Sequence, residues 1–140
     1  KYFSYAEQAL NKMKKIGSSV FGLPVPDPEK FGVIELDNNE NIVGIEEKPL
    51  KPKSNLIIPG MYFFDSNACE FAKTLKPSDR GELEITDLIQ IYLSQNKLAL
   101  QRLDETIIPV NICNIRLITI TVPSNWDVIA AITSLVFRLI

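Results

Sequence analysis

The strongest constraint on the fold is a hairpin pattern between residues 32 and 48. The segment GVIELD alternates apolar and polar side chains, as a half-buried strand does, and NIVGIEEK is its expected partner strand. Between them, DNNEN has the composition of a tight turn. These two segments therefore predict an antiparallel pair of strands.

Helices and strands alternate along the rest of the chain. Apolar residues recur at helical spacing from Tyr2 to Met13, with Gly17 as a stop, and again from Ile85 to Tyr92. The segments SSVFGLPV and LALQRL have the composition of strands. We therefore expect an α/β fold in which a mixed sheet is flanked by helices.

Two local breaks are expected in the middle of the chain. Pro59 and Gly60 interrupt the apolar strand 56–64, which should kink or open there because proline is confined to edges and bulges within sheets. Asp65 or Ser66 is expected to cap a short helix that continues until the next proline.

Composition excludes several classes of function. The 140 residues are 46% hydrophobic and 23% charged, which is typical of one globular domain. A net charge of −2 argues against a nucleic-acid partner. The chain has no histidine, which excludes a Ser-His or Cys-His nucleophile pair and any histidine metal site.

The cysteines and the apolar segments bear on the compartment. Cys69 and Cys113 lack the spacing of a metal motif, and we expect both to be buried thiols in a reducing cytoplasm. We recognise no signal peptide, and the apolar window 128–140 is too short to span a bilayer. The sequence therefore predicts a cytoplasmic protein without a membrane partner.

The chain changes character near residue 104. Of its 32 charged residues (15 basic and 17 acidic), only Arg116, Asp127 and Arg138 lie beyond Glu105. We therefore divide the chain into residues 1–104, which carry the recognisable patterns, and an apolar tail 105–140 of unknown role. One hypothesis is that the tail is a frameshifted or recombined segment.

The first candidate site is the segment IEEKPLKPKSN. Strand alternation would place Glu46 and Lys48 on one face and Glu47 on the other, and Pro49 would hold Lys48 extended. Carboxylates accept hydrogen bonds from vicinal hydroxyls, and an ammonium binds phosphate, so Glu47 and Lys48 could hold two parts of one ligand if the strand end is twisted. The alternative is a set of solvated charges at the start of a loop.

Two further clusters leave similar choices open. Gly60 and Tyr62 lie in an apolar strand, where they could approach a ligand or pack in the core around a bulge. Arg80 precedes a helix and could bind a phosphate with two hydrogen bonds, or it could pair with Glu82 or Glu84 on the surface.

Taken in order, four motifs resemble one enzyme family. VPDPEKFGVIELD, IEEKPLKPKSN, GMYFFD and LKPSDRGELEITDLIQIYL are similar, with their spacings, to the bacterial glucose-1-phosphate thymidylyltransferases over roughly Lys14 to Leu103. Related uridylyltransferases, which read more like GEIQLTD near the end, rank second. The resemblance implies a Rossmann-like nucleotidyltransferase fold and a Mg²⁺-dependent reaction of dTTP with glucose 1-phosphate. The dTDP-glucose formed feeds deoxysugars such as dTDP-rhamnose, and the family's enzymes are usually homotetramers.

The resemblance also implies roles for five residues. Gly32 would approach the sugar hydroxyls with its backbone, and Glu47 would accept hydrogen bonds from the sugar ring hydroxyls. Lys48 would contact the sugar phosphate, Tyr62 would line the sugar pocket, and Arg80 would be a second phosphate ligand.

Other family motifs have no match in this sequence. The family's G-x-G-T-R-L phosphate loop and its first metal aspartate are missing, which implies a fold that is incomplete at the N-terminal side. The W-L-D-T-G-T segment that carries the second metal aspartate is replaced by RLDETIIPV, in which Asp104 is a faint echo. Pro59 also stands where the family has part of a valine-threonine pair. We therefore expect no complete metal site and no catalysis by the isolated chain, and a non-catalytic sugar-phosphate-binding fragment is the alternative function.

Overall fold

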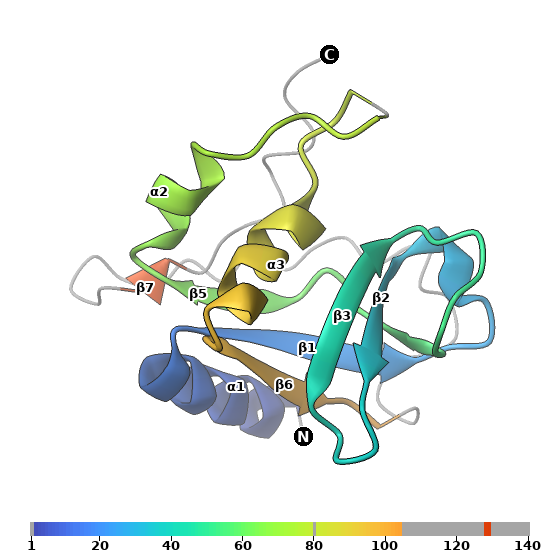
Figure 1. The fold of residues 1–140 in the computed structure, drawn as a ribbon. Coiled ribbons are helices and arrows are strands. Elements are labelled where there is room, and N and C mark those ends of the chain that lie inside the picture. The colour runs from blue at the N-terminus through green and yellow to red at the C-terminus, as the bar shows by residue number, and fades with distance from the viewer. Residues whose placement is uncertain (1, 80, 105–127, 130–140) are drawn as a thin grey trace.

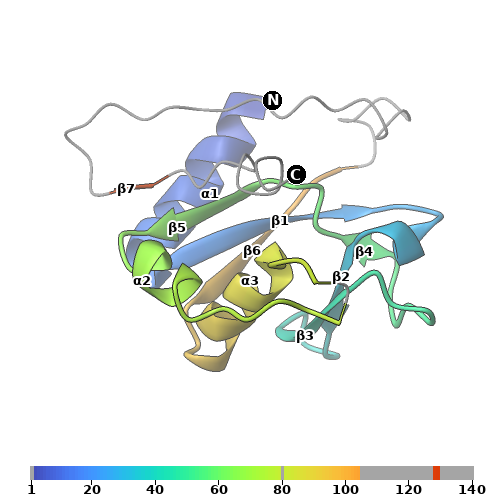
Figure 2. The same ribbon diagram turned by 90° about the horizontal axis from the view of Figure 1, so that it is seen from above.

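The computed structural model describes residues 2–79, 81–104 and 128–129. They form a mixed sheet with helices packed against it (Figures 1 and 2). In chain order the elements are α1 (Tyr2–Ile16), β1 (Ser18–Pro24), the 3-10 turn η1 (Pro28–Lys30), β2 (Gly32–Leu36), β3 (Ile42–Glu47), β4 (Leu56–Ile57), β5 (Tyr62–Asp65), α2 (Ala68–Ala72), α3 (Ile85–Ser94), β6 (Leu98–Arg102) and β7 (Val128–Ile129).

Strand β1 is the centre of the sheet. On one edge it pairs in parallel with β6, and on the other edge it pairs antiparallel first with β5 and then with β4. Strand β4 also pairs with β2, which forms the predicted hairpin with β3. The order β3-β2-β4-β1-β5-β7, with β6 beside β1, confirms a mixed sheet that contains one hairpin.

Helices α1 and α3 lie on opposite sides of β1 (Figure 2). Successive residues of a strand point to opposite faces, so Val20 joins the core cluster that contains Leu88 and Ile89 of α3, and Phe21 joins the cluster that contains Met13 of α1. Because both faces are covered, the first three residues of β2 are all buried, which differs from the alternation expected for GVIELD.

The predicted break at Pro59 and Gly60 is confirmed. The apolar segment divides into β4 and β5, which pair with successive parts of β1. Gly60 has a φ of 78°, a left-handed conformation that glycine adopts without a steric penalty. Between the two strands, the carbonyl of Met61 accepts a hydrogen bond from the backbone N–H of Phe21 at 3.2 Å.

The expected N-cap and the expected end of the next helix were wrong. Helix α2 ends at Ala72 instead of continuing to the next proline, and its N-cap residue is Asn67 rather than Asp65 or Ser66. The Asp65 carboxylate accepts hydrogen bonds from the Asn67 backbone at 3.1 Å and from the Tyr92 hydroxyl at 2.6 Å. The carboxylate thus ties the start of α2 to α3.

The prediction that Cys69 is a buried thiol was also wrong, because its side chain is exposed. Helix α2 has only five residues and buries only Ala68 among them, so the next position faces outward. Cys113 lies outside the described residues.

The predicted tail 105–140 is described only at Val128–Ile129, which pair antiparallel with β5. The domain boundary near residue 104 and the hypothesis of a frameshifted tail therefore stay predictions. Among the described residues, no helix is both long enough and apolar enough to cross a membrane.

Candidate functional site

Gly32 and Glu47 lie directly opposite each other where β2 begins and β3 ends. A Cβ atom added at Gly32 would lie 3.3 Å from Oε2 of Glu47 and only 2.8 Å from Cγ2 of Thr86 on α3. Real Cβ atoms avoid the shorter distance, so the packing of α3 on the hairpin requires a glycine here. The first turn of α3 therefore meets the end of the hairpin at the Glu47 carboxylate.

The conformation of Lys48 differs from the expected one. Pro49 was expected to hold Lys48 extended, but the φ of Lys48 is 45°, in the left-handed region. The chain must turn here, because the loop after β3 crosses β2 to reach β4. The backbone N–H of Lys48 donates to the carbonyl of Phe31 at 2.9 Å, which fixes the start of the turn.

This turn brings Lys48 to the same side as Glu47. The Lys48 ammonium lies 4.0 Å from Oε1 of Glu47, so the expectation that Lys48 shares a face with Glu46 was wrong. A left-handed non-glycine residue costs on the order of 1 to 3 kcal/mol, and such strained residues cluster at ligand sites. An ammonium has three donors, so Lys48 can contact Glu47 and a phosphate oxygen together.

Tyr62 is connected to this place through the apolar core. Its side chain shares a core cluster with Ile58, and Cδ1 of Ile58 lies 3.9 Å from the Cβ position at Gly32. The Tyr62 and Phe64 rings pack with centroids 5.4 Å apart. Burial raises the pKa of Tyr62 to about 12, so its hydroxyl stays protonated at neutral pH.

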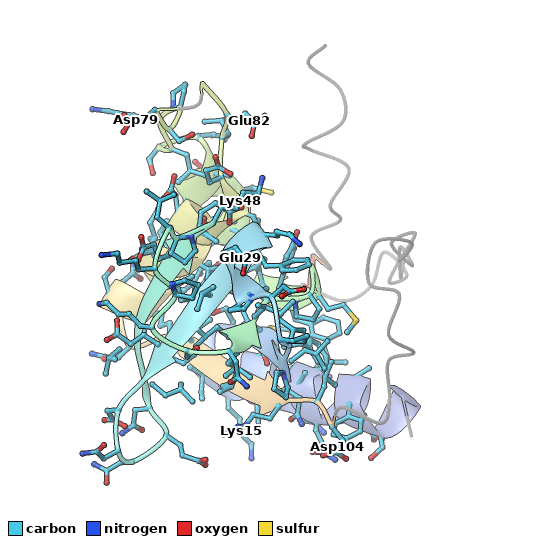
Figure 3. The ribbon with its side chains drawn as sticks, turned by 90° about the vertical axis from the view of Figure 1, so that its right-hand side faces the viewer. Lys15, Glu29, Lys48, Asp79, Glu82 and Asp104 are labelled. Atoms are coloured by element: carbon cyan, nitrogen blue, oxygen red, sulfur yellow. The ribbon has the colours of Figure 1, made fainter. Side chains whose placement is uncertain are left out.

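Arg80 lies outside the described residues, so its predicted phosphate contact is untested. The residues around it form a tight loop before α3, in which the backbone N–H of Ser78 donates to the carbonyl of Glu82 at 2.8 Å. Figure 3 shows Asp79 and Glu82 beyond Lys48, at the same end of the molecule.

Thr86 was missed by the sequence reasoning. It lies in the first turn of α3, is 3% exposed, and its hydroxyl has no hydrogen-bond partner among the described residues. Glu84, the N-cap residue, makes no side-chain capping bond, and the N-terminus of a helix favours negative charge. The available signal was a threonine next to the apolar face of a predicted helix, which does not reveal its contact with β2.

Asp104, the weak match to the family's second metal aspartate, lies elsewhere. Its carboxylate accepts a hydrogen bond from the Tyr5 hydroxyl of α1 at 2.6 Å, which raises the pKa of Tyr5. Figure 3 shows Lys48 in the upper half of the view and Asp104 near its lower end. The described part of the chain holds no group of three or more His, Cys, Asp or Glu side chains that could bind a metal ion.

A cavity of about 310 Å³ is lined by residues of β2, β3 and the loop after β3, together with Gln90 of α3. Its charged lining residues are Glu35, Glu46 and Lys53, and Gly32, Glu47 and Lys48 do not line it. The Lys53 ammonium lies 2.8 Å from the Glu35 carboxylate, and this hydrogen bond raises the pKa of Lys53. This cavity and the cluster around Glu47 therefore have different lining residues, although Glu46 and Pro49 of the cavity are the sequence neighbours of Glu47 and Lys48.

Comparisons with known proteins agree with the motifs. The family model described as nucleotidyl transferase matches residues 1–129. A glucose-1-phosphate thymidylyltransferase of Neisseria gonorrhoeae is 56% identical over 88 residues, which are 63% of this chain and 31% of that protein. One from Mycobacterium tuberculosis is 44% identical over 85 residues, 61% of this chain and 30% of that protein.

A solved structure is similar as well. It belongs to a Bacillus anthracis protein assigned as a glucose-1-phosphate thymidylyltransferase, in complex with sucrose, and has a TM-score of 0.62 at 42% identity. The match covers 72% of this chain and 40% of that one, and the curated relatives above are covered over less than a third of their length. The match confirms the expected nucleotidyltransferase fold, and the chain belongs to the nucleotidyl transferase family.

Proposed function

We propose that this protein is a glucose-1-phosphate thymidylyltransferase and that the described residues form part of its sugar-phosphate site. The observation that carries the proposal is the meeting of Gly32, Glu47 and Lys48 at the end of the hairpin. The names of the relatives support the choice of substrates, although each relative is much longer than the matched segment.

Each of the three residues has a distinct task in this proposal. Glu47 accepts hydrogen bonds from vicinal sugar hydroxyls, because an ionised carboxylate offers two acceptor oxygens. Gly32 has no side chain, so the sugar can approach the backbone of β2 closely. Lys48, at 4.0 Å from Glu47, binds the phosphate attached to the same sugar. Tyr62 provides an apolar wall with a protonated hydroxyl.

The proposed reaction needs mainly positioning and positive charge. A phosphate oxygen of glucose 1-phosphate attacks the α-phosphorus of dTTP, a new P–O bond forms, and the bond to the departing pyrophosphate breaks. Catalysis of such displacements comes from orienting the reactants and from cations near the crowded phosphates. Lys48 supplies one cation, and Arg80 is proposed as the second.

The remaining features of the family are proposed without assigned residues. A divalent cation, expected to be Mg²⁺, would add positive charge at the nucleotide phosphates, and the residues that the structure describes include no group of three or more His, Cys, Asp or Glu side chains to hold it. A homotetramer in the cytoplasm, and delivery of dTDP-glucose to deoxysugar synthesis such as that of dTDP-rhamnose, follow from the same assignment.

Calorimetric titration with glucose 1-phosphate tests the proposal. The Lys48→Ala variant should bind at least about tenfold more weakly than the unsubstituted chain, a cost of about 1.4 kcal/mol. Lys73→Ala is the matched control, because Lys73 also pairs with a neighbouring glutamate, Glu70 at 2.7 Å, but lies on α2. Equal weakening by both substitutions, or no binding by a folded chain, would contradict the proposal.

Once binding is seen, an assay of pyrophosphate release by the same protein distinguishes the alternative functions. Release of pyrophosphate from dTTP but not from UTP supports the thymidylyl assignment, and the reverse preference supports a uridylyltransferase. Binding of glucose 1-phosphate without release from either nucleotide agrees both with the expectation that the isolated chain does not catalyse the transfer and with a non-catalytic sugar-phosphate-binding fragment.

A further inference from the structure

The loop from Lys48 to Asn55 has to cross a strand. It leaves the end of β3, yet the strand that it enters, β4, lies on the far side of β2 in the order β3-β2-β4. Figures 1 and 2 show the loop passing around β2 to reach β4. The left-handed turn at Lys48 starts this crossing, so the conformation of Lys48 depends on where the loop ends.

The far end of the loop is fixed to β2 by Ser54. Its hydroxyl donates to the carbonyl of Ile34 at 2.5 Å and accepts a hydrogen bond from the backbone N–H of Leu56 at 3.1 Å. Beside it, Lys53 pairs with Glu35, the next residue of β2, at 2.8 Å. Together they hold the loop at the point where it has passed over the strand.

The part of the loop between these two ends is stiff. Pro49 and Pro52 restrict two of the five residues that separate Lys48 from Ser54, and Pro49 is buried. A short, stiff segment that is fixed at Ser54 leaves few conformations for Lys48. A strained backbone conformation persists only where the surrounding structure holds it in place. The Ser54 anchor is one of the contacts that hold Lys48.

We propose that Ser54 is a positioning residue for Lys48: it holds the crossing loop so that the Lys48 ammonium stays beside Glu47 and can bind a phosphate. The inference rests on the proposed function, because Lys48 is the phosphate ligand there. Loss of the Ser54 anchor leaves the bond from the Lys48 N–H to the Phe31 carbonyl and the Lys53–Glu35 pair in place, but it removes one of the contacts that oppose the extended conformation preferred before proline, so the Lys48 ammonium spends less time beside Glu47.

A double-mutant cycle tests the coupling between Ser54 and Lys48. Ser54→Ala should weaken the binding of glucose 1-phosphate about fivefold, the effect of one net hydrogen bond. In the Lys48→Ala background the same change should have an effect of less than about twofold, because the group that it positions is absent. Ser54→Thr, which keeps the hydroxyl, should restore binding. Ser94→Ala is the control, because that hydroxyl donates to the Ile91 carbonyl within α3.

The outcomes separate this inference from the proposed function. Equal weakening in both backgrounds, or no effect of Ser54→Ala while Lys48→Ala abolishes binding, overturns the positioning role alone. No binding by the unsubstituted chain overturns both proposals.

If Ser54→Ala does not fold, Lys53→Glu replaces it in the same cycle. This substitution turns the exposed Lys53–Glu35 ion pair into two like charges and so weakens the same end of the loop. It should weaken binding only while Lys48 is present, and adding Glu35→Lys should restore it. Equal weakening with and without Lys48 overturns the positioning role.

Discussion

The packing at Gly32 allows one prediction to be worked out from distances. Gly32→Ala adds a methyl group 2.8 Å from Cγ2 of Thr86 and 3.3 Å from Oε2 of Glu47. Forcing an extra methyl group into such a site costs about 1 to 3 kcal/mol. Replacing glycine at an ordinary φ returns about 0.4 to 1 kcal/mol through the unfolded state. The two ranges leave a net loss between about 0 and 2.6 kcal/mol, and we expect a value near the middle, about 1.3 kcal/mol.

Urea denaturation measures this loss as a shift of the midpoint at constant slope. Thr86→Ser removes Cγ2 and with it the shortest contact, so the cost of Gly32→Ala should largely vanish in the Thr86→Ser background. Gly44→Ala is the matched control on β3, because its new methyl would meet, at 3.1 Å, the movable end of the Glu35 side chain. A Gly32→Ala variant as stable as the original chain, or one that Thr86→Ser does not rescue, would refute the reasoning.

Three other predictions follow from single contacts. Because burial raises the pKa of Tyr62 to about 12, the stability that it contributes is complete below pH 10 and falls as the pH rises toward 12; Tyr62→Phe should flatten this alkaline loss in urea denaturation, and an unchanged profile would count against it. Tyr92→Phe removes the 2.6 Å hydrogen bond to the Asp65 carboxylate and should lower the free energy of unfolding by about 1 to 3 kcal/mol, whereas a change below about 0.5 kcal/mol would show that the bond is unimportant. Cys69 is exposed and should react with a thiol reagent in the native protein, with Cys69→Ala as the control; labelling of Cys69 only after unfolding would favour the original expectation of a buried thiol.

Local patterns predicted much of the fold. The hairpin of β2 and β3 and the division of the apolar segment at Pro59 and Gly60 both depend on turn residues next to strand-like runs. Such signals act over a few residues, and the structure confirms them. The length of α2 was harder to predict, because apolar residues continue at helical spacing beyond Ala72, where the helix ends.

The site was predicted less completely because its contacts are distant in sequence. The local preference of a residue before proline indicated an extended Lys48, but the crossing from β3 over β2 to β4 imposes a left-handed turn. The contact of Thr86 with Gly32 spans 54 positions (86 − 32) and depends on how α3 packs on the hairpin. The sequence indicated which residue types could bind a sugar phosphate, whereas their arrangement follows from the strand order.

The most direct test of the central claim is a map of backbone amide chemical shifts during titration of the labelled chain with glucose 1-phosphate. The account predicts saturable shifts centred on Gly32, Glu47, Lys48 and Thr86, where the hairpin end meets the first turn of α3. Shifts centred instead on Glu35 and Glu46, around the 310 Å³ cavity, would contradict the account, as would no shifts at all.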